Sequence, residues 1–330
     1  MKVLLCARSD YANSNSGDMD IIFKIYNFLK ERNIEVQICG ASEEVDYGKF
    51  DIVHLFDIKN IFDTYTHFKR ASNYKCNIVV SPMYFNMSRF FEYTNNTSRV
   101  NSWNNCKAYR ELILKKSKLI ICNSNYEREL IARDFGIGGK VITVHNGVMV
   151  NYEDIPLYDF KSRYGIDKYV LCVGRICECK NQLTLSKVCN ELKINLVLVG
   201  TAMDEEYLKA CLKYKTTNYL GFMKEYDLYN AYTFAKAHVL TSYSEVTSLS
   251  SLKAGAQGCN IVVSEEGASR EYFNDMALYC NPYDYDSIKA AVKKAITTKK
   301  NDKLKNYIRD NYKVDKMLEE IYKGYLLLTK

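Results

Sequence analysis

The sequence has no apolar run that approaches the 18 or so residues of a membrane-spanning helix. Its N-terminal stretch, MKVLLCARSD, has only a short apolar run, which is typical of a buried first strand. We therefore expect neither a signal peptide nor a membrane span, and a cytoplasmic location. The hydrophobic share of 47% and the charged share of 26% are those of a folded soluble protein, which argues against a disordered chain.

Signatures of several other protein classes are missing as well. A dinucleotide dehydrogenase would carry a G-x-G-x-x-G stretch after a strand, and the sequence has none. No repeat of roughly 20 to 50 residues is visible, so a solenoid is not supported. The net charge of +7 is mild and comes without a nucleic-acid-binding motif. Such a charge suits an anionic small molecule or an anionic membrane surface, and we expect no nucleic-acid partner.

Cysteine is plentiful, with 12 residues, but its pattern predicts neither disulfides nor a metal site. The cysteines are scattered, several lie in predicted strands, and a chain of this length can stabilise itself, so we expect reduced thiols. Cys177 and Cys179 form a C-x-C motif without a second cysteine or histidine pair at zinc spacing. The four histidines are also scattered; His54 and His238 lie in or beside apolar strands, where we expect satisfied core residues.

The order of apolar and amphipathic segments predicts two α/β domains. A chain of 330 residues is long for one hydrophobic core, and strands alternate with helices in two series separated by a polar connection. We predict two doubly wound, Rossmann-like domains that face a cleft, over residues 1–155 and 156–313, followed by a terminal helix over 314–330. The expected strands span 3–6, 35–39, 51–56, 75–81, 119–123, 141–144, 170–173, 195–199, 218–220, 237–240 and 260–263, and the expected helices 21–31, 125–135, 182–192, 205–214, 225–235, 248–257, 285–297 and 314–328.

Residues 239–271, VLTSYSEVTSLSSLKAGAQGCNIVVSEEGASRE, are the stretch around which the second domain is organised. A strand is followed by an acidic turn at Glu245, a helix of small and apolar residues and, after almost no loop, a second strand. This order is that of a βαβ unit in a parallel sheet. The first N–H groups of the helix are unpaired and carry partial positive charge, so the turn predicts a phosphate site.

Two cations lie at the same predicted edge of the second sheet. Arg175 directly follows a strand, and Lys180 lies just before a helix. A pair in these positions can hold a diphosphate and neutralise the charge that develops when the diphosphate leaves. Because surface cations are common, the pair alone does not establish such a site.

Longer stretches of the sequence match a known family. In the second half these are VGRICECKNQ, LVLVG, NYLGFM, LYNAYTFAKAHVLTSYSE, SSLKAGAQGCNIVVSEEGASREYF and NPYDYDSI, and in the first half, more loosely, SGDMDIIFKIYNFLKERNIEV and VVSPMYFN. Together they resemble the family 4 glycosyltransferases, which are retaining enzymes of the B-type two-domain fold. The resemblance implies transfer of a sugar from a nucleoside diphosphate sugar to an acceptor hydroxyl, without a metal or cofactor, and a terminal helix that returns to the first domain.

The resemblance also implies roles for residues of the second domain. Arg175 and Lys180 would contact the diphosphate, and Glu245 would face the donor sugar. The other implied donor-binding residues are Gly174 beside the cations, Phe222 and Met223 near the base, and Val246, Thr247, Ser248 and Leu249 in the loop that offers amides to the phosphate and the sugar.

The first domain would contribute to the acceptor side. The residues implied there are Gly17, Asp18 and Met83. Gly17 permits a close backbone approach, whereas Asp18 could equally cap the following helix. Met83 stands near the position where related enzymes often have a histidine, which leaves acceptor-side catalysis unassigned.

One position departs from the family pattern. The family motif is Glu-x7-Glu, but Lys253 lies eight positions after Glu245. The second glutamate of the family binds ribose hydroxyls, and a lysine cannot accept hydrogen bonds. Lys253 should face the donor and weaken its binding, unless it pairs with Glu265, Glu266 or Glu271. Two interpretations remain: an active transferase, or a degenerate subunit that binds a partner transferase or a sugar without turnover. A sugar-nucleotide epimerase would need acid and base carboxylates that are not recognisable.

Residues 85–118 depart from the α/β rhythm of the first domain. Seven basic residues, among them Arg110, are interspersed there with phenylalanine, tyrosine and the single tryptophan, Trp103. Basic and aromatic residues together suit a membrane interface or an anionic acceptor. This segment could therefore dock on anionic lipid to reach a lipid-linked acceptor in the synthesis of a surface polysaccharide or glycoconjugate. The alternative is a solvated helical face with some buried aromatic side chains.

Overall fold

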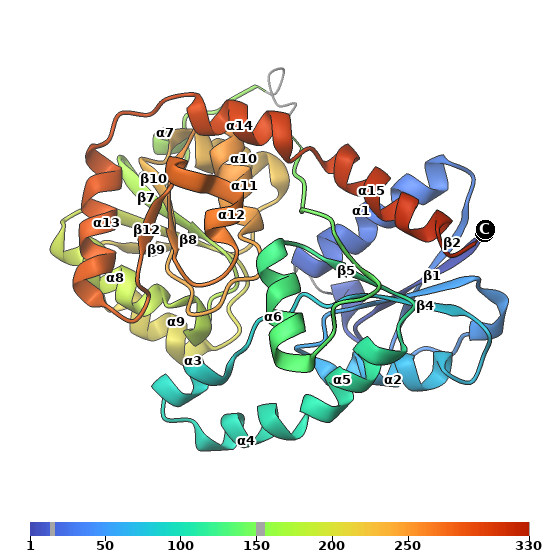
Figure 1. Cartoon of the computed structure of the whole chain (residues 1–330). Coiled ribbons are helices and arrows are strands. Elements are labelled where there is room, and N and C mark those ends of the chain that lie inside the picture. The colour runs from blue at the N-terminus through green and yellow to red at the C-terminus, as the bar shows by residue number, and fades with distance from the viewer. Residues whose placement is uncertain (14–16, 150–155, 330) are drawn as a thin grey trace. The chain divides into compact units, whose positions relative to one another are not determined.

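The computed structural model describes residues 1–13, 17–149 and 156–329, and the chain divides into two compact units (Figure 1). Unit 1 comprises Met1–Asn146 together with Val314–Lys330, and unit 2 comprises Gly147–Lys313. Each unit is built around one six-stranded parallel sheet, which confirms the predicted fold class of two doubly wound α/β domains. The predicted boundary between 155 and 156 falls at the end of a stretch that lies outside the described residues.

The sheet of unit 1 has the strand order β2-β1-β3-β4-β5-β6. All five residues of β3, IVHLF, are buried, as is typical of a parallel strand that is covered on both faces. Helices lie on both sides of the sheet in Figure 1. The strands are β1 (Lys2–Ala7), β2 (Glu35–Gly40), β3 (Ile52–Phe56), β4 (Asn77–Ser81), β5 (Leu119–Cys122) and β6 (Val141–Thr143), and the helices are α1 (Gly17–Glu31), α2 (Ile61–Ala71), α3 (Ser88–Tyr93), α4 (Thr97–Asn105), α5 (Lys107–Lys116), α6 (Asn125–Phe135) and α15 (Val314–Leu326).

The sheet of unit 2 has the strand order β12-β11-β10-β7-β8-β9. Its central strands are short apolar runs, and all four residues of β10, AHVL, are buried. The strands are β7 (Tyr169–Val173), β8 (Asn195–Val199), β9 (Thr217–Tyr219), β10 (Ala237–Leu240), β11 (Asn260–Ser264) and β12 (Leu278–Cys280), and the helices are α7 (Phe160–Tyr164), α8 (Gln182–Glu191), α9 (Glu205–Leu212), α10 (Glu225–Phe234), α11 (Leu249–Ala256), α12 (Ser269–Phe273), α13 (Tyr285–Thr297) and α14 (Lys303–Asn311).

Every predicted strand is present, with ends that differ by at most two residues. The sequence analysis missed β12 and the helices α2, α7, α12 and α14, and within 85–118 it gave no bounds for α3, α4 and α5. Strand β12 has three residues, and α7 and α12 have five each, which is too short for an apolar repeat to be visible. Helix α1 begins four residues before its predicted start, because two acidic residues in its first turn extend it toward the preceding loop.

The two strand histidines are core residues, as predicted. In β3 the ring of His54 contacts the hydroxyl of Tyr325 at 2.6 Å and that of Ser81 at 2.9 Å. In β10 His238 is fully buried and contacts the hydroxyl of Ser251 at 3.3 Å. Burial lowers the pKa of both imidazoles to about 3, so both are neutral at physiological pH.

Candidate functional site

The strand order of unit 2 places two loops together. From β7 the chain continues to β8 on one side, while β10 lies on the other side of β7. The loops that leave the carboxyl ends of β7 and β10 therefore start side by side and lead to opposite sides of the sheet. Such a place is a topological switch point, the usual ligand site of an open α/β sheet. These are residues 174–181 and residues 241–248. The predicted residues Arg175, Lys180 and Glu245 all lie in these two loops.

The first loop is held by a close backbone approach. The N–H of Gly174 donates to the carbonyl of Val199 at 2.9 Å. Gly200 has a φ of 139°, and a Cβ added to it would lie 2.1 Å from the carbonyl oxygen of Gly174. Only glycine fits there, because any side chain would push the two loops apart.

The second loop is hydrogen-bonded to the first and lies against the loop that follows β11. The N–H of Tyr243 donates to the carbonyl of Cys179 at 2.9 Å, and the hydroxyl of Thr241 donates to that of Asn181 at 3.2 Å. Gly267, with a φ of 102°, lies against Glu245: an added Cβ would be 2.0 Å from the carbonyl oxygen of Glu245. The backbone that carries Glu245 is therefore held by the loop after β7 and by the turn at Gly267.

Lys180 and Glu245 face each other across the switch point. The Nζ of Lys180 lies 2.6 Å from the Oε2 of Glu245, and the two side chains are 15% and 12% exposed. Burial alone would lower the pKa of the Lys180 ammonium, but the carboxylate of Glu245 outweighs it, and the net shift is upward. Lys180 is therefore charged at neutral pH. Arg175 is exposed beside them.

The loop that carries Glu245 also carries buried hydroxyl groups without partners in the described chain. Among the buried hydroxyls that have no hydrogen-bond partner in the described parts of the chain are those of Ser242, Thr247, Ser248 and Ser269. Thr247 and Ser248 directly precede α11, whose first N–H groups are also unpaired in an isolated helix. A buried hydroxyl left without a partner costs about 1–3 kcal/mol. Together the hydroxyls, the helix end and the two cations can receive an oxyanion.

The remaining predicted donor-binding residues lie at neighbouring loops. Phe222 is 51% exposed and Met223 is buried, and both lie in the loop between β9 and α10. The Nζ of Lys253, in α11, lies 3.7 Å from the Oε1 of Glu225, the first residue of α10. The sequence analysis did not consider this partner for Lys253.

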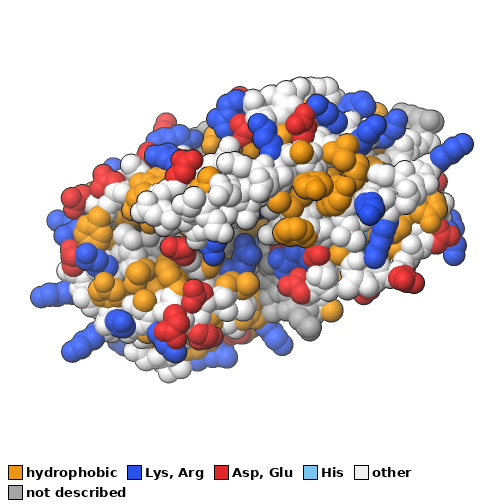
Figure 2. Space-filling view, turned by 90° about the horizontal axis from the view of Figure 1, so that it is seen from below, with side chains coloured by type: hydrophobic (Ala, Val, Ile, Leu, Met, Phe, Trp, Pro, Cys, Tyr) orange, Lys and Arg blue, Asp and Glu red, His pale blue; other side chains and the backbone are white. Residues whose placement is uncertain are grey.

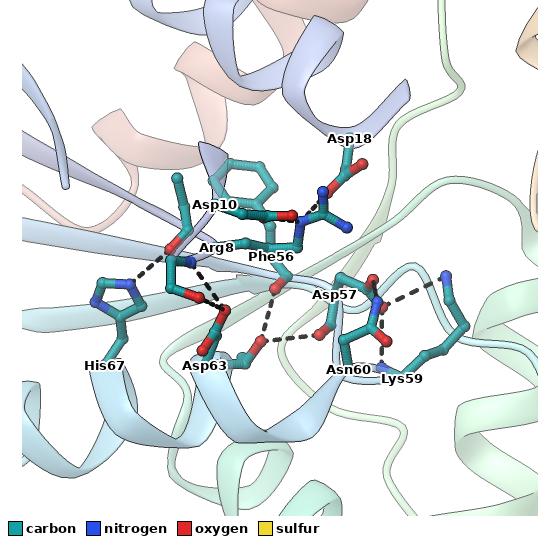
Figure 3. Close-up of polar contacts among 12 residues, drawn as sticks. Arg8, Asp10, Asp18, Phe56, Asp57, Lys59, Asn60, Asp63 and His67 are labelled. Atoms are coloured by element: carbon teal, nitrogen blue, oxygen red, sulfur yellow. Dashed lines mark hydrogen bonds and ion pairs between the residues drawn. The ribbon is translucent and has the colours of Figure 1, made fainter. Parts of the chain in front are cut away.

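Unit 1 has its own switch point, between β1 and β3 (Figure 3). Arg8 follows β1, and its Nε lies 3.2 Å from Asp10 and 3.7 Å from Asp18. Asp57 follows β3 and accepts from the N–H of Lys59 at 3.0 Å and from the amide of Asn60 at 2.6 Å. These charged side chains from different loops converge at one edge of the sheet.

The acceptor-side residues predicted from the sequence lie near this edge. Gly17 and Asp18 are the first two residues of α1. Met83 follows β4, is buried and has a φ of 48°. The Nζ of Lys59 donates to the carbonyl of Met83, which links the loop after β4 to the loop after β3. The sequence analysis missed Arg8 and Lys59, because nothing in their own neighbourhood distinguishes them from surface cations.

Glu127 is a further residue of unit 1 that the sequence analysis missed. It is 1% exposed, and its two oxygens accept from the backbone N–H groups of Tyr84 and Asn123, each at 2.6 Å. Burial raises the pKa of this carboxyl to about 7. Its backbone N–H donates to the hydroxyl of Ser124, so the S-x-x-E capping pattern at the start of α6 was a visible signal.

Residues 85–118 form α3, α4 and α5 and the loop before them. Arg110 does not belong to an exposed basic face, which corrects the sequence analysis: its side chain is 2% exposed, lies 3.6 Å from the Trp103 ring centroid and donates to two carbonyls. Tyr93 and Tyr109 are about half exposed. On the face shown in Figure 2, Lys and Arg side chains are interspersed with acidic and hydrophobic ones. In the described ranges no helix is long and apolar enough to cross a membrane.

Comparisons with known proteins bear on what this arrangement does. A model of Glycosyltransferase Family 4 matches residues 21–152, and a model of Glycosyl transferases group 1 matches residues 157–314. No curated protein sequence matches the chain significantly.

Solved structures with the same fold cover nearly the whole chain. Sucrose-phosphate synthase from Thermosynechococcus elongatus has a TM-score of 0.83 at 13% identity, over 100% of this chain and 99% of that chain. HepE from Anabaena, in complex with UDP-glucose, has a TM-score of 0.74 at 14% identity, over 98% of each chain. A glycosyltransferase from Rickettsia africae has a TM-score of 0.71 at 14% identity, over 100% of this chain and 98% of that chain.

The fold and the two family models define the class of this protein: it is a glycosyltransferase with the B-type fold of two six-stranded parallel sheets. More narrowly, the model that spans unit 2 supports a group 1 glycosyltransferase.

Proposed function

We propose that this glycosyltransferase moves a sugar from a nucleoside diphosphate sugar to an acceptor hydroxyl, with retention of configuration. The observation that carries the proposal is the switch point of unit 2. There Lys180 and Glu245 form an ion pair, and the loop of Glu245 continues to Thr247 and Ser248 at the start of α11, whose hydroxyls have no partner in the described chain.

The diphosphate binds to these groups, which together form an anion site. Arg175 and Lys180 supply positive charge, and the N-terminus of α11 with Thr247 and Ser248 supplies hydrogen-bond donors. As the bond to the sugar breaks, the same groups stabilise the charge that develops on the leaving diphosphate. Entry of the diphosphate gives Lys180 a second anionic partner beside Glu245, whose carboxylate faces the donor sugar. No metal or cofactor takes part in the proposed reaction.

The nucleoside end of the donor lies toward the loop between β9 and α10. The half-exposed ring of Phe222 can stack on a base, and the side chain of Met223 is buried. The ribose, which joins the base to the diphosphate, then lies near Lys253 and Glu225. Because HepE is described in complex with UDP-glucose, uridine diphosphate sugars are the first donors to test.

The acceptor is a saccharide or a lipid-linked saccharide, bound from unit 1 by the polar edge that includes Gly17, Asp18 and Met83. The half-exposed Tyr93 and Tyr109, together with the exposed lysines of α5, support docking of residues 85–118 on an anionic membrane. Liposome co-sedimentation should then increase with anionic lipid content and fall with salt. Binding that is independent of both would contradict membrane docking while leaving the transfer reaction untouched.

A panel of nucleoside diphosphate sugars tests the proposal directly, with thermal shift for binding and hydrolysis for turnover. Arg175→Ala and Lys180→Ala should each lose about 2 kcal/mol or more of transition-state stabilisation, roughly 30-fold in kcat/KM. Unchanged donor affinity and turnover in both variants would contradict the assigned diphosphate site.

Lys253 favours a second candidate, a degenerate subunit that binds a sugar or a partner transferase. Its ammonium stands where a carboxylate would accept hydrogen bonds from a ribose. Binding of a nucleoside diphosphate sugar without turnover in the same panel, or no binding of any donor, would support the subunit over the enzyme.

A further inference from the structure

The loop that carries Arg175 and Lys180 also holds two thiols in contact. Cys177 directly precedes a single 3₁₀ turn, Glu178–Lys180, and Cys179 lies within that turn. Their sulfur atoms are 3.4 Å apart. A disulfide bond measures about 2.05 Å, so the two sulfurs need to approach by only about 1.4 Å.

Most other thiols of the chain cannot react in this way. Eight of the twelve cysteines are buried, and the partly exposed ones are Cys76, Cys106, Cys177 and Cys179. Burial raises the pKa of buried thiols such as Cys172 and Cys280 to about 12. These remain protonated at neutral pH and are poor nucleophiles.

Cys177 has the opposite electrostatic environment. The hydrogen bond with the thiol of Cys179 lowers the pKa of Cys177 to about 6, against the effect of burial, and the positive charges of Lys180 and Arg175 act in the same direction. Cys177 is therefore the more readily deprotonated of the two thiols, and it is partly accessible to solvent. A reactive nucleophile thus lies one residue away from a second thiol.

We propose that Cys177 and Cys179 form a dithiol site that exchanges with low-molecular-weight disulfides and closes into an intramolecular disulfide on the loop of Arg175 and Lys180. The chemistry of this site does not depend on the proposed sugar transfer. It rests on the contact between the two sulfurs, the exposure of Cys177 and the two neighbouring cations.

The exchange proceeds in two balanced steps. The thiolate of Cys177 attacks one sulfur of oxidised glutathione, forms a mixed disulfide and releases one glutathione thiolate. Cys179 then loses its proton and attacks the Sγ of Cys177, which releases the second glutathione thiolate. The two protein thiols are oxidised, and one molecule of oxidised glutathione is reduced to two thiols.

The second step becomes favourable only after the first. In the reduced site the hydrogen bond and the charge of the Cys177 thiolate raise the pKa of Cys179, together with burial. Formation of the mixed disulfide removes that negative charge and leaves the nearby cations Lys180 and Arg175, which lower the pKa of Cys179. Cys179 is thereby activated as the resolving thiol.

Closure of the disulfide has a structural consequence at the switch point. The carbonyl of Cys179 accepts from the N–H of Tyr243, two residues before Glu245, and Lys180 is the next residue along the chain. Drawing Cys179 toward Cys177 therefore strains both loops that hold the ion pair of Lys180 and Glu245.

The test treats the full-length reduced protein with oxidised glutathione at neutral pH and follows it by intact mass and peptide mapping. The wild type should lose two hydrogens and end with a disulfide between Cys177 and Cys179. Cys179→Ser should stop at one glutathionyl group on Cys177, and Cys177→Ser should form neither product on this loop. Cys106→Ser, which changes another partly exposed thiol, should behave as the wild type.

Reaction rates make the test decisive even if a variant folds poorly. In the wild type, Cys177 should react about tenfold faster than Cys76 and Cys106, and the pH at which its rate is half-maximal should lie near the pKa of Cys177. Equal rates for these three thiols would overturn the proposal. A stable mixed disulfide in the wild type would also overturn it. So would a Cys179→Ser variant that loses two hydrogens as the wild type does.

Discussion

The two sheets arrange charge differently at equivalent places. At the switch point of unit 2, one lysine and one glutamate face each other with little exposure to solvent. At the switch point of unit 1, Arg8 contacts two aspartates, of which Asp10 is 67% exposed. The carboxylate of Asp57 in unit 1 already accepts from Lys59 and Asn60, whereas the hydroxyls before α11 in unit 2 have no partner in the described chain.

This difference shows that the strand order determines where a ligand site can lie. Which ligand binds there depends on which hydrogen-bonding groups of the site still lack a partner. The unit 2 site has unsatisfied donors and cations, so an anion would gain contacts that the free protein lacks. The unit 1 site is rich in carboxylates, which accept hydrogen bonds from hydroxyl groups and repel phosphates. Under the proposed function, the edge of unit 2 takes the diphosphate and the edge of unit 1 takes the hydroxyl groups of the acceptor.

Removing the buried cation should have the largest effect. Lys180→Ala should destabilise unit 2 by about 3 kcal/mol, because the carboxylate of Glu245 loses its partner in a site mostly closed to water. Hydrogen exchange of the β7 and β10 amides in urea would measure it. The control Lys209→Ala breaks a pair with Glu206 whose side chains are 65% and 82% exposed, and it should cost less than about 0.5 kcal/mol. Similar losses of unfolding free energy in both variants would mean that burial does not increase the contribution of the ion pair to stability.

A methyl group at Gly267 should have the next largest effect. Gly267→Ala places a Cβ 2.0 Å from the carbonyl oxygen of Glu245 at a φ of 102°, so the turn must shift, at a cost of about 2 kcal/mol. Donor affinity should fall with it, measured by calorimetry. Gly138→Ala is the matched control, because an added Cβ there meets nothing within 4 Å. Normal donor affinity in Gly267→Ala would show that the Glu245 loop is not held by this contact.

The pH dependence of unit 1 should come partly from Glu127. Its folded-state pKa is raised to about 7, above the ordinary value of 4.5, so the folded state binds a proton more tightly than the unfolded state. Its contribution to stability is present below pH 4.5 and is lost as the pH rises through 7, with a slope of at most about 1.4 kcal/mol per pH unit. Fluorescence of Trp103, the single tryptophan, reports unfolding of unit 1. Glu127→Gln should flatten this slope, and an equally steep profile in that variant would assign the dependence to other groups.

The smallest effect is expected at Lys253. Lys253→Glu introduces a carboxylate that can accept from a ribose, but it also brings that carboxylate close to Glu225. The double variant with Glu225→Gln removes the repulsion and should bind a nucleoside diphosphate sugar about fivefold more tightly than the wild type, or about 1 kcal/mol. The single variant should gain less. Weaker or equal calorimetric affinity in the double variant would mean that lysine is the residue suited to this site.

The strands could be predicted because a parallel strand buried on both faces is a continuous apolar run, as in IVHLF and AHVL. The turn at Glu245 could be located for the same reason, since it lies between two such runs. The contact between Lys180 and Glu245 could not be predicted, because the two residues are 65 positions apart. The sequence analysis assigned Lys180 to the diphosphate and Glu245 to the sugar. Their contact with each other follows only from the strand order, which makes β7 and β10 neighbours.

The surroundings and partners of charged side chains were the hardest features to predict. Arg110 was assigned to a surface, but its guanidinium stacks on Trp103 and binds backbone carbonyls inside unit 1. Lys253 was expected to face a ligand or one of three later glutamates, whereas the ion pair with Glu225 joins it to the start of a helix earlier in the chain. Sequence spacing gives the face of a helix, but the partner on that face comes from another element.

The bond between His54 and Tyr325 has a consequence for the order of folding during synthesis. The two residues are 271 positions apart, and the buried ring of His54 meets the hydroxyl of a helix made after all of unit 2. Residues 147–313 can therefore complete their core while unit 1, begun first, still lacks α15. Until that helix arrives, the apolar surface beneath it stays open to water, so the earliest part of the chain is the last to be closed and the most exposed to aggregation on the ribosome.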